Sequence, residues 1–384
     1  MTALVSPILP ALALLCCMAS TTSAQSVRLT TPPNAALREE FSDIRGVREL
    51  ADGRLLVSDY RDERVVLVDL ARQTVTPLLT RGSGPREARI PTRLIPGPGD
   101  STLVVDLGNN RLILLDEDGT PVRTILAEHQ GILGLRGVDA AGSFYYAVPA
   151  WSEPRALPGD SVRLIRWDPR SAREEPIATV QGERMRSDIR EPARIPRIPT
   201  VGYASQDGWT VDDQGRVRIV RSGGYRIETR APGAPAAIGP SYAYPTRAVT
   251  AADRVAWVRR FLAASPMSGK GPEGGLGHSP AVTEAEVAVL TRGTQFADRH
   301  AMFNAGDVVA APGGILWVGR PMEPGDTARY DLFDAGGRRV SQIQLDPGRR
   351  VMAVGRRGAY VAYESGSGIQ FLERYSVPYL GQPR

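Results

Sequence analysis

Residues 97–116 read GPGDSTLVVDLGNNRLILLD, and residues 50–69 read LADGRLLVSDYRDERVVLVD. The two stretches share one frame: an apolar strand, an aspartate, four turn residues, an arginine, four apolar residues and a second aspartate. The frame recurs after 47 residues, so the chain contains an internal repeat. The aligned pairs are Asp59 with Asp106, Arg64 with Arg111, and Asp69 with Asp116.

The frame describes two buried strands joined by a tight turn. A glycine-containing turn begins the first strand, and the aspartate that closes it can cap the next turn through its side chain. The four apolar residues after the arginine predict a second buried strand. The second aspartate opens a hairpin turn, as in Asp116-Glu117-Asp118-Gly119. One such unit cannot bury both faces of its own sheet, so it must stack against neighbouring units.

Weaker copies of the unit continue towards the C-terminus. Their strands are predicted at residues 144–146 and 162–168, then 209–211, 217–220 and 225–228, then 315–318 and 330–334, and finally 351–354, 359–363 and 369–372. Six units of this size predict an all-β fold, a six-bladed β-propeller. A β-sandwich is the competing all-β fold, but regularly placed Asp and Gly residues favour radial repetition. A parallel α/β fold would need helices between strands, and residues 40–240 show no amphipathic helical pattern.

One stretch interrupts the repeat. Thr250 and Asp253 can cap a helix whose apolar positions include Val258 and Leu262. Thr283 and Glu286 have the spacing of a capping box and predict the start of a second helix. We therefore expect a helical insertion at residues 245–305, between blades four and five. In a propeller, such an insertion lies over one face.

The repeat resembles a known family. The frame is similar to NHL-type repeats, and residues 106–113 match them closely. The loop at residues 81–87 with the following Pro91 resembles the inter-blade stretch of bacterial six-bladed propellers of the NHL/TolB-like kind, although Arg86 stands where a glycine is usual. Residues 315–318 and 330–334 show the same resemblance. The resemblance implies a six-bladed propeller and no particular activity, because relatives include both binding scaffolds and enzymes.

The N-terminus has the pattern of an export signal. Residues 4–19 are almost wholly apolar, and Ala24 follows small residues that suit cleavage. We expect a signal peptide at residues 1–24 and a propeller at residues 25–384, located in the periplasm or outside the cell. Lipidation is one alternative, because Cys16 and Cys17 stand at the end of the apolar run. A retained anchor helix is the other, because the segment contains no Lys or Arg. Cleavage would remove both cysteines and leave no stable membrane span.

The positive charge does not point to nucleic acid. The formal net charge is +5, but Arg and acidic residues are interleaved, as in residues 61–64. A nucleic-acid surface needs its cations gathered on one face, and no such clustering is evident. We therefore expect no nucleic-acid partner, and a monomer that binds a small molecule or a protein.

No motif for catalysis or metal binding is found. The three histidines, His129, His278 and His300, lack the spacing of a metal site and are interpreted as exposed or capping residues. We predict no catalytic residue, metal ligand or cofactor. The candidate ligand-binding residues are the arginines of a long proline-broken stretch between blades three and four, since guanidinium groups on a loop can hold carboxylate or phosphate groups. These are Arg184, Arg186, Arg190, Arg194 and Arg197.

Two functions from different classes remain open. The first is a non-catalytic propeller that binds a ligand or a protein through its central face, helped by the arginine-rich loop and the helical insertion. The second is a hydrolase, lyase or lactonase that uses a divalent cation bound in the channel. Acidic or histidine side chains converging from three or more blades would favour the enzyme. An apolar or arginine-lined channel would favour binding.

Overall fold

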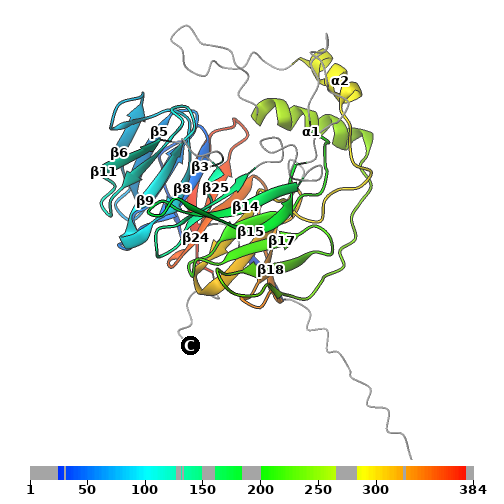
Figure 1. Cartoon of the computed structure of the whole chain (residues 1–384). Helices are drawn as coiled ribbons and strands as arrows, with labels where there is room; N and C mark the ends of the chain where they lie inside the picture. Colours follow the sequence, from blue (N-terminus) through cyan, green and yellow to red (C-terminus); the bar gives the residue numbers. More distant parts are fainter. Residues whose placement is uncertain are drawn as a thin grey trace, which may run out of the picture.

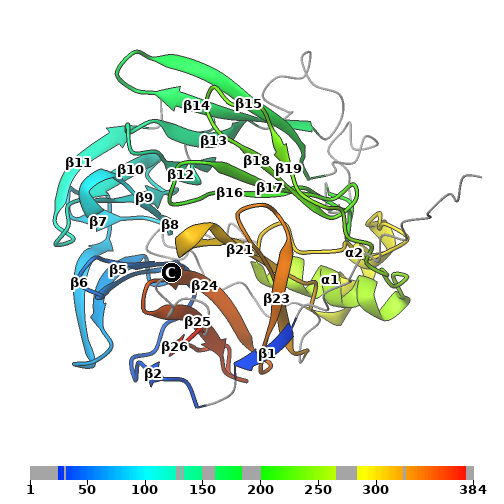
Figure 2. The ribbon, with the colours of Figure 1, turned by 90° about the horizontal axis from the view of Figure 1, so that it is seen from below.

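The computed structural model describes residues 25–29, 32–126, 131, 134–148, 161–183, 200–264, 283–322 and 326–377. The described residues form six separate β-sheets arranged in a ring, with two α-helices at one side (Figures 1 and 2). The predicted all-β, six-bladed propeller is confirmed.

The first three blades are antiparallel sheets of consecutive strands. Blade one contains β3 (Ile44–Glu49), β4 (Leu55–Asp59), β5 (Arg64–Asp69) and β6 (Thr74–Arg81), with the short β7 (Glu87–Ala88) beside β6. Blade two contains β8 (Pro91–Pro96), β9 (Thr102–Asp106), β10 (Arg111–Leu115) and β11 (Pro121–Leu126). Blade three contains β12 (Gly137–Val138), β13 (Phe144–Val148), β14 (Ser161–Asp168) and β15 (Arg173–Gln181).

The last three blades include two strands from the N-terminus. Blade four contains β16 (Gly208–Val211), β17 (Val217–Arg221), β18 (Arg226–Arg230) and β19 (Ala237–Ile238). Blade five contains β20 (Val308–Ala311), β21 (Ile315–Gly319), β22 (Ala328–Phe333) and β23 (Arg339–Leu345), and β1 (Gln25–Leu29) adds a parallel strand at its edge. Blade six contains β24 (Arg349–Gly355), β25 (Gly358–Glu364) and β26 (Gln370–Tyr375), and β2 (Ala35–Ala36) is its outermost strand. The N-terminal segment thus closes the ring on the last blade.

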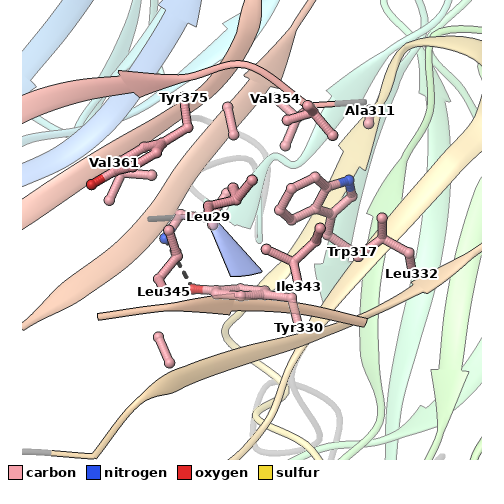
Figure 3. Close-up of a cluster of buried hydrophobic side chains, with 14 residues drawn as sticks. Leu29, Ala311, Trp317, Tyr330, Leu332, Ile343, Leu345, Val354, Val361 and Tyr375 are labelled. Atoms are coloured by element: carbon pink, nitrogen blue, oxygen red, sulfur yellow. Dashed lines mark hydrogen bonds between the residues drawn. The ribbon is translucent and has the colours of Figure 1, made fainter. Parts of the chain in front are cut away.

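The hydrophobic core is divided among the blade interfaces. Six clusters of buried apolar side chains each lie between two adjacent blades. Figure 3 shows the cluster between blades five and six, where Trp317 and Ile343 face Val354 and Val361. The hydroxyl of Tyr330 accepts a hydrogen bond from the backbone N–H of Val351 across this interface, at 2.9 Å. Because neighbouring blades cover both faces of each sheet near the axis, inner strands such as β4 and β9 are buried along their length, whereas outermost strands such as β6 and β11 are largely exposed.

Close approach of the innermost strands requires glycine. At Gly137 of β12, an added Cβ would lie 2.3 Å from Cβ of Val211 in β16, which is far inside van der Waals contact. A Cβ added at Gly46 of β3 would likewise lie 2.6 Å from the backbone oxygen of Thr92 in β8. At these two positions, the innermost strands of neighbouring blades can approach each other this closely only because glycine has no side chain.

The repeated frame has a structural role. Asp106 is fully buried, and it accepts hydrogen bonds from the backbone N–H of Arg89 and from Nε of Arg111, both at 2.8 Å. Asp59 accepts from the backbone N–H groups of Ser42 and Asp43 in the same manner. Each aspartate holds the backbone that leads into the innermost strand of its own blade. The expected contact with the following turn is present at Asp106, which accepts a hydrogen bond from Nδ2 of Asn109 at 2.8 Å. The second aspartates do cap their own turns, as Asp116 does for residues 118 and 120.

The insertion lies between β19 and β20, as predicted. It contains α1 (Ala251–Ala264) and α2 (Glu284–Gly293). Both predicted caps are present, since Thr250 and Asp253 exchange hydrogen bonds and Thr283 and Glu286 form a capping box. The helices bury a small core of their own, made of Val258, Leu262, Val287 and Leu290. Within the described residues, neither helix has the length and apolar character needed to cross a membrane.

Candidate ligand-binding site at one end of the channel

All six innermost strands begin at the same end of the channel. Each blade is an antiparallel meander that starts at the axis, so β3, β8, β12, β16, β20 and β24 run in one direction around it. The insertion joins the outermost strand of blade four to the start of β20 and therefore lies at this end, as Figure 1 also shows. We call it the insertion end. The connections between the second and third strands of each blade lie at the insertion end as well.

Two arginines at the insertion end come from neighbouring blades. Arg93 is on β8, and Arg136 immediately precedes β12. Arg136 donates a hydrogen bond from Nη1 to the backbone oxygen of Trp209 at 3.0 Å, and its guanidinium lies 5.3 Å from the centre of the indole ring. Arg136 thereby bridges blades three and four.

Nearby carboxylates of the described residues do not offset the loss of hydration of these two guanidinium groups. Burial and, to a lesser degree, the nearby charge of Arg93 together lower the pKa of Arg136 to about 10. Burial also lowers the pKa of Arg93, and no described carboxylate opposes this effect. Both groups remain charged at neutral pH. The insertion end therefore holds two partly desolvated cations, of which Arg93 has no acidic partner among the described residues.

A third arginine lies on the opposite side of the ring. Arg350, on β24, donates a weak hydrogen bond from Nη2 to the backbone oxygen of Ile44 in β3, at 3.4 Å. It also interacts with Asp307, which immediately precedes β20 and is 8% exposed. Burial raises the pKa of the Asp307 carboxyl, while the charge of Arg350 and a hydrogen bond from Nδ2 of Asn304, at 2.6 Å, oppose that rise. The arginines thus come from blades two, three and six, and Asp307 is an acid partner for the third of them.

The histidines and acidic residues do not converge. In the part of the chain that the structure describes, no three His, Cys, Asp or Glu side chains are grouped as metal ligands. His300 is 6% exposed, so of the two roles expected for it, exposed or capping, the first does not hold. Its Nε2 lies 3.1 Å from Oδ2 of Asp253, the acidic residue of the α1 cap, and its ring lies 4.2 Å from that of Tyr203. His129 and His278 are outside the described residues.

The predicted site residues are not among those described. Arg184, Arg186, Arg190, Arg194 and Arg197 all fall within residues 184–199, outside the described ranges. Sequence analysis missed Arg93, Arg136 and Arg350. A signal for them exists, because each is a charged residue next to the apolar positions of an innermost strand, as in Thr92-Arg93-Leu94-Ile95. An arginine in such a place needs either a partner or a ligand.

Comparison with protein-family models and with curated protein sequences finds no match. Among solved structures, the chain is similar to a gluconolactonase from Xanthomonas campestris, with 12% identity, a TM-score of 0.42, and coverage of 88% of this chain and 91% of that one. It is also similar to the calcium-binding protein regucalcin from Agrobacterium tumefaciens, with 10% identity, a TM-score of 0.42, and coverage of 92% and 98%. A virginiamycin B lyase from Staphylococcus aureus gives 9% identity, a TM-score of 0.38, and coverage of 89% and 87%. At such identities and scores, none of these structures assigns an activity or a site residue to this chain.

Proposed function

We propose that this protein is a binding propeller that holds a small anionic molecule at the insertion end of its channel. The observation that carries the proposal is the arginine set of the innermost strands, and above all Arg93, which is partly buried without a described acidic partner. Taking a cation out of water is unfavourable unless a charge or hydrogen bonds replace the lost hydration. A bound carboxylate or phosphate group would supply that replacement. Guanidinium groups suit both, because they can donate two parallel hydrogen bonds.

The proposal makes opposite predictions for stability and for binding. Without ligand, Arg93→Met should raise the free energy of unfolding, because it replaces a partly desolvated cation with an apolar side chain of similar length. With ligand, the same variant should lose the stabilisation that binding provides. Citrate is a suitable probe, since it carries three carboxylates. We expect citrate to raise the melting temperature of the wild-type protein more than that of Arg93→Met.

A matched control is available in the same blade. Arg123 is on β11, the outermost strand of blade two, and is exposed. Arg123→Met removes the same charge far from the axis, so it should leave both the intrinsic stability and the response to citrate unchanged. An equal response to citrate in all three proteins would show that the anion acts only by general screening, and the proposal would fail.

Metal analysis of the purified protein separates the proposal from its rival. A cation-dependent hydrolase, lyase or lactonase would retain a divalent ion in stoichiometric amount. The proposed binding function expects no such ion, and finding one would replace it with the enzymatic alternative.

We further propose that the predicted arginines, Arg184, Arg186, Arg190, Arg194 and Arg197, contribute to the same site. The flanking strands support this, because β15 ends and β16 begins at the insertion end. Replacing all five with glutamine should weaken citrate binding, while the melting temperature without citrate should not change. A variant that binds citrate as tightly as the wild type would remove the loop from the site.

We also propose that the blades are of the NHL/TolB-like kind, and that the chain is exported as a monomer. The first rests on the aspartate and arginine frame of blades one and two. The second rests on residues 1–24, since Gln25, the first residue after the expected cleavage position, begins β1. Two measurements on protein from the periplasm or the medium test the second proposal. N-terminal sequencing tests export, which a retained leader or a lipid-modified cysteine would contradict. Analytical ultracentrifugation tests the monomeric state, which a dimer would contradict.

A further inference from the structure

A second cavity lies away from the channel. It has a volume of about 500 Å³ and is lined by the segments before α1 and after α2 and by the connection between β21 and β22. Arg320 directly follows β21, and Arg329 is on β22. These are the second and third strands of blade five, and neighbouring strands are roughly 4.8 Å apart. The cavity is therefore displaced from the axis and from Arg93, Arg136 and Arg350. Its volume suits a small organic molecule.

The most informative residue of its lining is Arg320. It is 4% exposed, and its Nη1 donates to Oδ2 of Asp331, a fully buried carboxylate, at 2.9 Å. Its Nε and Nη2 are buried and have no hydrogen-bond partner among the described residues. Nε and Nη2 form one edge of the guanidinium plane, so a complete two-donor edge is unused. The great majority of buried donors in proteins have a hydrogen-bond partner. The two donors of this edge have the geometry that binds a carboxylate.

The guanidinium is held in place by its neighbours. The hydroxyl of Tyr225 donates to the same Oδ2 of Asp331 at 2.5 Å, and the Arg320 guanidinium lies 5.3 Å from the Tyr225 ring. On the other side, the ring of Tyr244 covers the guanidinium with its centre 3.0 Å away. Tyr244 is 36% exposed and lines the cavity, so it can turn aside without breaking the core. The guanidinium plane is therefore held in one orientation, and one of its faces lies beneath a surface side chain.

Among the described residues, the lining carries three arginines, Arg247, Arg320 and Arg329, against one carboxylate, Asp326, so its net charge favours an organic acid. Arg329 is an exposed cation on the cavity wall, while Arg247 and His300 are already paired with Asp253. Pro321 and Met322 add apolar surface. We propose that the cavity binds a small carboxylic acid with a flat apolar body. Its carboxylate takes the Nε and Nη2 edge of Arg320, Arg329 adds a second positive charge, and the body lies in the cavity beside Pro321 and Met322.

Benzoate is the test ligand, and benzamide, with the same shape and no charge, is its control. We expect benzoate to bind to the purified full-length protein in calorimetric titration and benzamide not to bind at concentrations up to about 10 mM. Arg320→Lys keeps the charge next to Asp331 but removes the two-donor edge, so it should weaken benzoate binding by at least about tenfold at an unchanged melting temperature. Tyr244→Ala uncovers one face of the guanidinium and keeps the two-donor edge, so it should bind benzoate at least as tightly as the wild type.

Arg329→Met provides a second test in case Arg320→Lys fails to fold. Arg329 is exposed, so its loss should leave folding intact and weaken benzoate binding about threefold or more. Arg93→Met separates this site from the channel. If benzoate binding falls in Arg320→Lys and Arg329→Met but not in Arg93→Met, the second site is supported. If only Arg93→Met reduces binding, the channel site stands and the second site is refuted. Absence of benzoate binding to the wild type, or equal binding of benzamide, also refutes it.

Discussion

Replacing Arg111 tests whether the repeated frame is structural. Arg111 is 9% exposed and donates four hydrogen bonds: to Oδ2 of Asp106 at 2.8 Å, and to the backbone oxygens of Ser83, Gly84 and Glu87 at 3.2, 2.9 and 2.7 Å. Arg111→Met keeps much of the apolar stem but leaves a fully buried carboxylate and three carbonyl oxygens without their donor. Removing one partner of a buried ion pair costs about 3–5 kcal/mol. We expect a loss of that size in the free energy of unfolding.

The assay is equilibrium unfolding in urea followed by tryptophan fluorescence, with Arg72→Met as the matched control. Arg72 pairs with Asp69 at 2.9 Å, nearly the same distance, but its side chain is 80% exposed. An exposed pair contributes about 0–1 kcal/mol, so the control should unfold almost as the wild type does. Similar losses in both variants, or a loss below about 1 kcal/mol in Arg111→Met, would refute the reasoning that burial makes this pair important.

Three further predictions concern the frame, the insertion and the blade interfaces. Arg64→Met should destabilise less than Arg111→Met, by about 1 kcal/mol, because Arg64 lies 3.5 Å from Asp59 and its side chain is 24% exposed; urea unfolding of the two variants side by side gives the comparison. Hydrogen bonds from Arg247, the backbone of Thr250 and His300 hold the pKa of Asp253 well below its usual value, so its contribution to stability is complete above the usual carboxyl pKa of about 4 and is lost as the pH falls further. The protection of the α1 amides, taken relative to their intrinsic exchange rate at each pH, should therefore fall with acid in the wild type, and Asp253→Asn should show lower protection at neutral pH with a weaker dependence on acid; a profile shared by both proteins would contradict the assignment. Gly137→Ala should cost about 1–3 kcal/mol, because the new methyl group overlaps Val211, whereas Gly366→Ala, which meets open space, should not; equal melting temperatures would show that the blades can separate without cost.

Local chemistry explains what could be predicted about the fold. The strands of blades one and two follow from apolar runs bounded by glycine and aspartate, and such runs are recognised within a few residues. The capping box of Thr283 and Glu286 is similarly local, and α2 begins there. The backbone partners of Asp59 and Asp106 were not predictable in this way. Their side chains bind backbone 16 or 17 residues earlier in the chain, and no short-range pattern encodes that contact.

Most residues of the candidate sites could not be predicted from the sequence. Arg93, Arg136 and Arg350 belong to three blades, and their positions relative to one another depend on the closure of the ring. The unused edge of Arg320 depends on Asp331, Tyr225 and Tyr244, which come from two blades and from the segment before α1. Side-chain chemistry suggested arginine as the ligand-binding residue type, but the sequence pointed to the conspicuous arginine-rich loop.

The repeat at residues 50–69 and 97–116, with its weaker copies, was sufficient to predict an all-β chain of stacked units, and the caps at Thr250 and Thr283 were sufficient to predict helices after the fourth unit. These features depend on period, turn residues and caps, which act over short distances along the chain. Only the tertiary structure showed that β2 completes blade six, that glycines allow innermost strands to approach each other closely, and that Arg93 and Arg136 from neighbouring blades lie near each other. The physical reason is that these features depend on which residues become neighbours once the ring closes, and closure joins segments as far apart as Ala35 and Arg374.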